Sequence, residues 1–453
     1  MSTPLKAGFA RVDITPPLGA PIAGYFVPRR ATGVLDPLEA SCLALSDGSA
    51  TALLLSLDLL GIKNVCPDLC RSVASATGLP EEAVLIHCTH THTGPAVGNG
   101  DSDDGDAYPD GDDSYFELLA SRLASAAHDA IADLAPARLS IARSTAPRIS
   151  FPRRYRMKDG SIRTNPGVGN PDIAEPIGGA DETVQIVRID RDGASPIAIL
   201  NFQTHPDVIG GTLISADWPG TARRTAEAAI PGLRVVFVNG AQGDVNHVNV
   251  APGPGEDNGL APDFDDVPRG YAYSQHMGRV VAASLLSSWG RCVSVSAGPL
   301  GFVRKEVSVP SNMPRPDQIP LAEKYDALHR EGRDAEIPFA GMELTTVVAE
   351  AGRIMRLKDG PASFEMPLSL ITIGESVAIC GFPGEPFTDI GLRVKAGSPY
   401  AMTICACLAG GSFGYFPTAS AYAEGGYEAR SSTFGPTVAD DLVSAALSLV
   451  SAR

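Results

Sequence analysis

Val84-Leu85-Ile86-His87-Cys88-Thr89-His90-Thr91-His92-Thr93-Gly94-Pro95 runs from an apolar segment into a histidine-rich one and ends in a Gly-Pro turn. The apolar residues predict a strand over 83–89. Side chains two positions apart on an extended chain share a face, so we expect His90 and His92 to point together and His87 to point into the core. Three of the eight histidines lie in these few residues. Because neutral imidazole is a common zinc ligand, the pattern favours a metal site over two solvent-facing histidines.

Strand-like and helix-like segments alternate on both sides of this stretch. The alternation predicts an α/β fold in which mixed β-sheets are flanked by helices. We expect a single domain over residues 1–453, with a subdomain joint near 295–320, where prolines are dense. The predicted strands are 52–58, 83–89, 196–202, 234–238 and 376–381, and the predicted helices are 67–77, 114–134, 220–229, 270–289 and 437–451.

The composition excludes several classes of protein. The chain has 453 residues, with 36 Lys and Arg against 52 Asp and Glu, a net charge of −16. Such a chain lacks the basic surface that sequence-independent binding of nucleic acid needs. At 44% hydrophobic residues it can form a large core. No segment approaches the roughly 20 apolar residues of a membrane span, and the N-terminus does not resemble a signal peptide. We therefore expect a cytoplasmic protein with reduced cysteines, a small-molecule substrate and, as an option, homo-oligomers.

Polar side chains follow three other predicted strands. His205 closes the strand over 196–202, and Glu385 lies in the turn after 376–381. Asp244, Asn246 and His247 follow the strand over 234–238. In open α/β sheets, ligands bind beyond the carboxyl ends of the strands. Each residue has a structural alternative: Glu385, for example, could be an acid at a helix N-terminus.

Taken together, these motifs resemble a known family. Thr89–Pro95 is similar to the T-H-T-H-S-G-P signature of the neutral (alkaline, non-lysosomal) ceramidases. The opening of that family's catalytic domain resembles Gly8–Pro16. Three further motifs occur in the family's order, namely Thr204–Pro206, Pro383–Glu385 and Tyr415 with Tyr427-Glu428. The resemblance spans nearly the whole chain and covers the family's N-terminal catalytic domain, without its immunoglobulin-like C-terminal domain.

The resemblance implies a zinc amidase that cleaves an N-acyl bond. It implies one zinc ion per chain, a histidine and a tyrosine beside the scissile group, and an arginine facing the substrate. The zinc ligands would be His90, His205, Glu385 and Tyr415, and the other three residues would be His92, Tyr427 and Arg153.

One departure from the family changes the expected mechanism. Asn246 aligns with the family's serine, so on this alignment a serine nucleophile is excluded. We therefore expect a zinc-bound water as the nucleophile, His92 as general base, and Tyr427 and Arg153 as donors to the developing oxyanion. Asp244 and Asn246 would orient the substrate or a ligand imidazole.

Two more residues have open roles. Asp217 could contact the substrate or orient an imidazole, or it could cap the helix over 220–229. His247 could line the site or fill the turn. A second departure is Leu35, which replaces a histidine that we associate with a second, structural metal in the family.

The substrate is left open at this point. The sequence shows no cationic amphipathic helix, and a strongly acidic protein suits a membrane surface poorly, so we expect a small soluble amide and no stable membrane association. An ester, a lactone or ceramide itself remains an alternative, as do a metallophosphoesterase and an inactive binding homologue. The acidic stretches 101–113 and 256–266 are either solvated loops or lids that favour neutral and cationic substrates.

Overall fold

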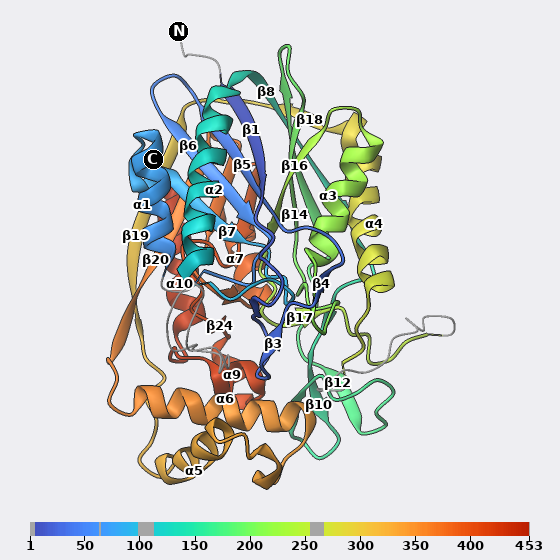
Figure 1. The fold of residues 1–453 in the computed structure, drawn as a ribbon, viewed down its shortest axis with the longest axis vertical. Coiled ribbons are helices and arrows are strands. Elements are labelled where there is room, and N and C mark those ends of the chain that lie inside the picture. The colour runs from blue at the N-terminus through green and yellow to red at the C-terminus, as the bar shows by residue number, and fades with distance from the viewer. Residues whose placement is uncertain (1–4, 63–64, 98–112, 254–266, 453) are drawn as a thin grey trace.

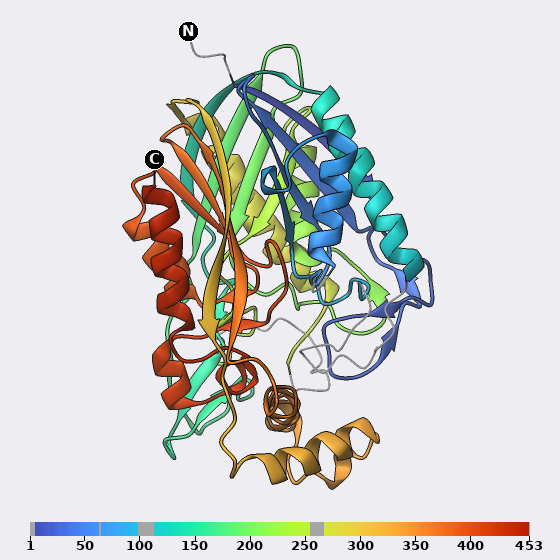
Figure 2. The ribbon, with the colours of Figure 1, turned by 90° about the vertical axis from the view of Figure 1, so that its left-hand side faces the viewer.

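Two β-sheets lie face to face between two outer layers of helices. The computed structural model describes residues 5–62, 65–97, 113–253 and 267–452. Figure 2 shows the sheets side by side, with helices on both outer sides. Figure 1 shows a separate pair of helices, α5 (Ile319–Arg330) and α6 (Gly341–Leu357), below the sheets. This is the mixed α/β architecture that the sequence predicts.

The first sheet has nine strands in the order β16-β14-β13-β8-β1-β5-β6-β7, with β18 paired to β8. Most neighbours are antiparallel, but β6 and β7 are parallel, as are β14 and β16. Strands β6, β7, β14 and β16 are buried along nearly their whole length and are therefore almost continuously apolar, whereas β1 and β8 in the middle of the order are only partly buried. The strands are β1 (Lys6–Asp13), β5 (Glu39–Ser46), β6 (Thr51–Leu57), β7 (Val84–Cys88), β8 (Ala135–Thr145), β13 (Thr183–Arg191), β14 (Ile197–Phe202), β16 (Arg234–Asn239) and β18 (Val293–Val295).

The second sheet is made of β19 (Leu300–Pro310), β20 (Ser363–Ile373), β21 (Val377–Gly381) and β23 (Met402–Ala406). Its inner face packs on the first sheet in one continuous apolar core. The chain passes from β18 to β19 between residues 295 and 300, within the segment where the sequence predicts a joint. Because both sheets share this core, the crossing lies inside a packed unit; the one-domain description stays a prediction.

Helices cover the outer faces of both sheets. On the first sheet, α1 (Cys66–Thr77) and α2 (Asp113–Ala132) pack on one half, and α3 (Asp217–Ala229) and α4 (Tyr271–Ser288) pack on the other. On the second sheet, α7 (Thr388–Gly397) and α10 (Val438–Ser451) do the same. None of the described helices is long and apolar enough to cross a membrane. All eight cysteines are free thiols, as expected.

Short elements below the sheets build the surroundings of the site. β22 (Glu385–Pro386) pairs with β24 (Tyr415–Phe416), and β17 (Val245–Asn246) pairs with β9 (Phe151–Pro152). A small sheet joins β10 (Arg154–Met157), β11 (Ile162–Thr164) and β12 (Ile173–Pro176), and α9 spans Tyr427–Ser431. The ten predicted elements are all present, with ends shifted by at most three residues. The acidic stretches 101–113 and 256–266 lie, apart from residue 113, outside the described residues.

Candidate metal centre and active site

Three buried histidines converge where β7 and β14 end. The ligand atoms of His90, His92 and His205 all lie within 4.8 Å of one another. The Nε2 atoms of His90 and His92 are 3.3 Å apart. The cluster can therefore hold a metal ion.

Backbone carbonyls fix the protonation of each ring. Nδ1 of His90 is 2.8 Å from the Leu60 oxygen, and Nδ1 of His92 is 3.0 Å from the Gly24 oxygen. Nδ1 of His205 lies 2.9 Å from the Gln242 oxygen and 3.0 Å from the Val245 oxygen. A carbonyl only accepts, so each Nδ1 carries the proton and each Nε2 presents a lone pair. Facing lone pairs repel unless a cation lies between them, so this donor set fits a metal ion.

The histidines converge for a reason that strand alternation does not supply. β7 ends at Cys88, and His90 has a φ of 77°, in the left-handed region. The expected convergence is confirmed, but a turn produces it rather than an extended chain. His87 does point into the core, where its Nδ1 donates to the Cys407 oxygen at 2.6 Å and its Nε2 accepts from the Asn239 amide at 3.0 Å. Burial lowers the pKa of His87 to about 4.

Glu385 adds a negative charge to the cluster. Its Oε2 is 3.0 Å from Nε2 of His205 and 3.3 Å from Nε2 of His90. The Gln242 amide donates to the same oxygen at 3.2 Å. Burial alone would raise the pKa of Glu385, but His90 and His205 hold it well below its usual value. An ionised carboxylate facing imidazole lone pairs strengthens the case for a bound cation.

Tyr415 and Arg153 lie on the side of His205. The rings of Tyr415 and His205 stack with centroids 6.4 Å apart. Burial, assisted by the nearby Glu385 carboxylate, raises the pKa of Tyr415 well above its usual value. Arg153 hydrogen-bonds Tyr415, donates to the Gly243 oxygen at 2.7 Å, and pairs with Glu428 at 2.6 Å. Its guanidinium is therefore committed to protein partners.

The cluster opens into a small chamber of about 30 Å³. By the usual allowance of about 10–15 Å³ for each water, the chamber has room for about two water molecules. Tyr427 forms part of its wall. Arg153 does not line it, so the expectation that this arginine faces the substrate is not met. The lining residues are Gly24, Tyr25, Phe26, Leu60, His90, His92, Glu385, Tyr415 and Tyr427.

Asp244 and Asn246 are near the cluster, but their side chains serve other elements. Asp244 Oδ1 accepts from the Thr388 amide at 2.7 Å and from its hydroxyl at 2.8 Å, so it caps α7. Asn246 donates to Asn165 Oδ1 at 2.9 Å. The expected orienting role belongs instead to the backbone of this turn, whose carbonyls bind His205 and Arg153.

Asp217 and His247 do not contact the chamber either. The Asp217 carboxylate accepts from the amides of Val208, Ile209 and Trp218, at 2.9, 3.1 and 2.6 Å. It thus holds the start of α3 and the loop after His205, which is the capping alternative. His247 Nε2 lies 2.5 Å from the Pro268 oxygen, and its ring packs beside Tyr273, so it fills the turn. The substrate-binding predictions for both residues are corrected accordingly.

A carboxylate that the sequence did not reveal lies behind His92. Asp207 Oδ1 is 3.5 Å from His92 Nδ1, accepts from the Tyr25 hydroxyl at 2.6 Å, and pairs with Arg269 at 2.6 Å. Burial opposes its ionisation, but Arg269 and His92 hold the pKa of Asp207 well below its usual value. Its position two residues after His205 was the one available signal.

Comparison with known proteins places the fold. No family model matches the sequence, and no curated protein does. Among solved structures, the neutral ceramidase from Pseudomonas aeruginosa superposes with a TM-score of 0.72 over 99% of this chain and 74% of that one, at 18% sequence identity. The chain has the fold of a neutral ceramidase. A ceramidase complexed with C2 gives a TM-score of 0.71, also at 18% identity, over 99% of this chain and 75% of that one.

The structural superposition confirms the fold that the sequence motifs implied. It extends the agreement from a few short motifs to nearly the full length of the described chain. At this level of identity the likeness establishes the architecture.

Proposed function

We propose that the protein is a zinc-dependent hydrolase that cleaves an amide (N-acyl) bond of a small substrate. The observation that carries the proposal is the convergence of three buried imidazole lone pairs and an ionised carboxylate in one cluster, of which His90, His92 and Glu385 line the chamber. The two ceramidases with the same fold support amide hydrolysis as the reaction class.

His90, His205, Glu385 and Tyr415 are the ligands that we propose for the ion. Zinc, when bound, lowers the pKa of a coordinated water to about 7 and polarises the scissile carbonyl. The metal-competent cluster among the described residues consists of histidines, with the Glu385 carboxylate beside it and no cysteine as a member. A nitrogen and oxygen donor set of this kind suits zinc.

His92 is the proposed general base. Its Nε2 also lies within the metal-competent cluster, so ligation in place of Tyr415 is the other assignment. The base role is favoured by Asp207, because a carboxylate 3.5 Å from Nδ1, beside the Gly24 carbonyl that fixes the tautomer, stabilises the protonated form of the imidazole. His92 would take the proton of the attacking water and return it to the leaving amine.

Tyr427 is the proposed donor to the developing oxyanion, since its side chain lines the chamber. Arg153 contacts the cluster directly, since its Nη1 lies 3.4 Å from Nε2 of His205, and its bonds to Tyr415 and the Gly243 carbonyl hold the metal-binding wall in place. Because water is the proposed nucleophile, the mechanism does not require a serine. Asn246, at the position of the family's serine, hydrogen-bonds Asn165 instead.

The alternatives make different predictions. Esters and lactones would react by the same chemistry. A dinuclear phosphoesterase needs a second metal cluster, and the histidine cluster is the only such group among the described residues. An inactive homologue would bind metal without turnover. Cytoplasmic location and homo-oligomerisation are part of the same proposal.

Metal analysis of the purified protein tests the proposal directly. We expect about one zinc per chain in the native protein and none in His90→Ala, because that variant loses an imidazole donor. Zinc-loaded protein should hydrolyse N-acyl amines in a panel that also contains esters, lactones and phosphoesters. Absence of metal, or full metal content in His90→Ala, would show the centre to be wrongly assigned.

A further inference from the structure

We infer that the substrate is a water-soluble amide whose body carries a carboxylate and lies in a polar cleft beside the chamber. The inference rests on the proposed function, because it names the substrate class of the same site. The polar cleft is a cavity of about 730 Å³ between β11, the start of α6 and residues 424–427.

The chamber and the polar cleft differ in size, so they can hold different parts of the substrate. The chamber of about 30 Å³ admits little more than the scissile group and water. The polar cleft falls in the usual range of ligand sites, about 300–1,000 Å³. Tyr427 forms a wall of both cavities. A substrate with its amide at the metal-binding cluster therefore continues past Tyr427 into the cleft.

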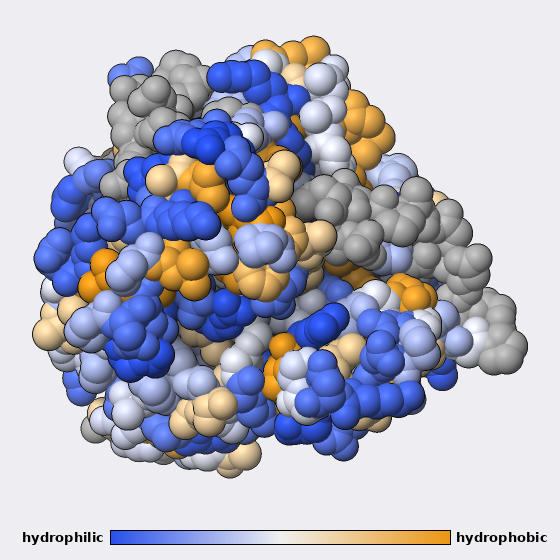
Figure 3. All heavy atoms as spheres, turned by 90° about the horizontal axis from the view of Figure 1, so that it is seen from below, coloured by the Kyte–Doolittle hydropathy of each residue, from blue (hydrophilic) through white to orange (hydrophobic). Residues whose placement is uncertain are grey.

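Charged side chains make the cleft unsuitable for alkyl chains. Glu424 in its wall pairs with Arg154 at 3.1 Å and Arg156 at 3.4 Å, and Glu343 pairs with Arg430 at 3.1 Å. A hydrocarbon chain laid over these groups would remove their water without replacing its hydrogen bonds. Figure 3 shows the lower face of the molecule, where hydrophilic residues dominate and hydrophobic ones form separate small patches.

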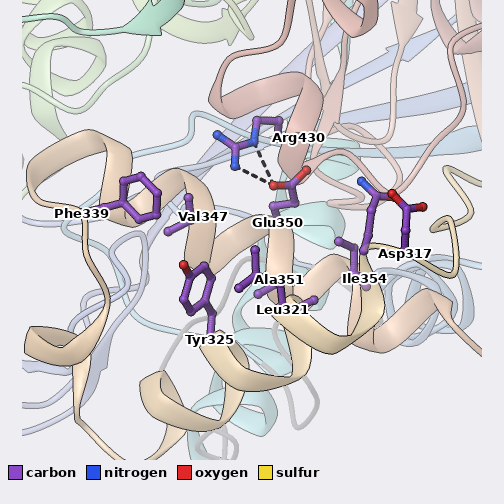
Figure 4. Close-up of a pocket in the computed structure, with 11 residues that line it drawn as sticks. Asp317, Leu321, Tyr325, Phe339, Val347, Glu350, Ala351, Ile354 and Arg430 are labelled. Atoms are coloured by element: carbon purple, nitrogen blue, oxygen red, sulfur yellow. Dashed lines mark hydrogen bonds and ion pairs between the residues drawn. The ribbon is translucent and has the colours of Figure 1, made fainter.

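An apolar groove next to the polar cleft lies beyond a further ion pair, and the two cavities share Phe339 and Arg430 in their walls. It is a groove of about 280 Å³ between α5 and α6, lined by Leu321, Tyr325 and Val347 among others. Figure 4 shows Arg430 bound to Glu350 at its edge, a contact of 2.6 Å. Because Arg430 lines both cavities, an acyl chain would have to cross the polar cleft before it reached the groove.

Arg163 is the group in the cleft that we assign to the substrate. Its side chain is exposed, and it forms no ion pair with any residue that the structure describes. Asp159, an acid on the same hairpin, accepts from the Ser161 amide and hydroxyl at 2.9 and 2.6 Å, and these bonds, with a smaller contribution from the Arg163 charge, lower the pKa of Asp159. A guanidinium matches a carboxylate in charge and in its planar, two-pronged geometry.

The strand that carries Arg163 is tied to the chamber. Thr164, the next residue, accepts a hydrogen bond from the Tyr427 amide at 3.3 Å and donates to Glu428 at 2.9 Å. Arg163 is therefore held at a defined position relative to Tyr427, as recognition of a group at a fixed distance from the amide requires. The reaction adds water across that amide: the C–N bond breaks, a C–O bond forms, and a water proton ends on the amine.

Matched pairs of substrates test the inference. Each pair consists of an N-acyl amino acid and its carboxamide, compared with a short-chain ceramide in detergent micelles. We expect kcat/KM to be at least tenfold higher for the carboxylate than for the carboxamide. Arg163→Gln should bring that ratio to about one through KM. The control, Lys158→Gln, neutralises an exposed cation of the same hairpin outside the cleft and should keep the ratio.

Calorimetric titration of metal-free protein with the N-acyl amino acid separates this inference from the proposed function. Binding that Arg163→Gln abolishes, without turnover by zinc-loaded protein, would support the cleft and count against the hydrolase. Turnover with ceramide preferred, an unchanged ratio in Arg163→Gln, or no binding of the N-acyl amino acid would overturn the inference.

Discussion

Asp207 shows how a residue can matter to a site without facing it. Its carboxylate receives the Tyr25 hydroxyl, pairs with Arg269 and lies 3.5 Å from His92. Substitution by asparagine keeps the shape and removes the charge. Since outer partners of site histidines commonly contribute 10- to 100-fold, we expect Asp207→Asn to lower kcat by that order. Zinc content should be retained.

Steady-state kinetics with metal analysis of the same sample is the measurement. Asp192→Asn is the matched control, because that carboxylate pairs with Arg138 on the surface. An Asp207→Asn variant that keeps full kcat would leave His92 without a demonstrated partner. Loss of zinc together with kcat would favour His92 as a ligand rather than a base.

Site residues that belong to sequence motifs can be predicted from the sequence, whereas those in irregular loops cannot. The histidine pair stands out because imidazoles crowd into a few positions, and Glu385 follows a clear strand. Tyr25 and Asp207 lie in irregular segments, where no periodicity relates a position to a direction. The sequence could not show that the side chains of Asp244 and Asn246 serve other elements while carbonyls of the same turn contact His205 and Arg153.

The residue before α7 has no side chain that could cap the helix. Phe387 precedes the helix, and Asp244, from a distant turn, accepts from the Thr388 amide. Loss of a capping carboxylate typically costs about 1 kcal/mol, up to about 2. We expect Asp244→Ala to reduce the free energy of unfolding by this amount. Asparagine caps about as well as aspartate, so Asp244→Asn should recover most of it.

Urea denaturation of both variants, with kcat measured in parallel, distinguishes a cap from a catalytic group. Activity that survives in Asp244→Asn fits a cap. Full stability combined with no turnover in that variant would restore the chemical role predicted from sequence.

Elements with strong periodicity were predicted, and those with mixed signals were not. β6, β7, β14 and β16 are buried apolar runs, and α2 and α10 carry clear apolar faces. α5 was missed because its proline-rich approach indicates a break, although Pro320 lies in the first turn, where proline is tolerated. The antiparallel strands β8 and β19 alternate buried and exposed residues and have few apolar runs.

Buried histidines make the stability of the whole molecule depend on pH. Burial lowers the pKa of His87, His205 and His247 to about 4. An unfolded histidine titrates near 6.5, so between about pH 6.5 and 4 the unfolded chain binds more protons than the folded one. Stability is therefore complete above this window and falls as the pH drops through it.

Urea denaturation of metal-free protein across that range measures the effect. Each histidine contributes a slope of up to about 1.4 kcal/mol per pH unit. His87 and His247 lie outside the proposed ligand set, so the slope should persist when zinc is present. A free energy of unfolding that stays flat from pH 6.5 to 4 would contradict neutral burial of these rings.

The carbonyl groups that orient the three histidines also shape the mutations that the site tolerates. A peptide oxygen remains when its side chain changes, so positions 60 and 245 can change among residues of similar volume without losing the acceptor, whereas the side-chain amide of Gln242 also donates to Glu385. Position 24 is different: Gly24 has a φ of +105°, and a Cβ there would lie 2.9 Å from Nδ1 of His92. A neutral-drift library should therefore recover many active variants at positions 60 and 245 and almost none at 24.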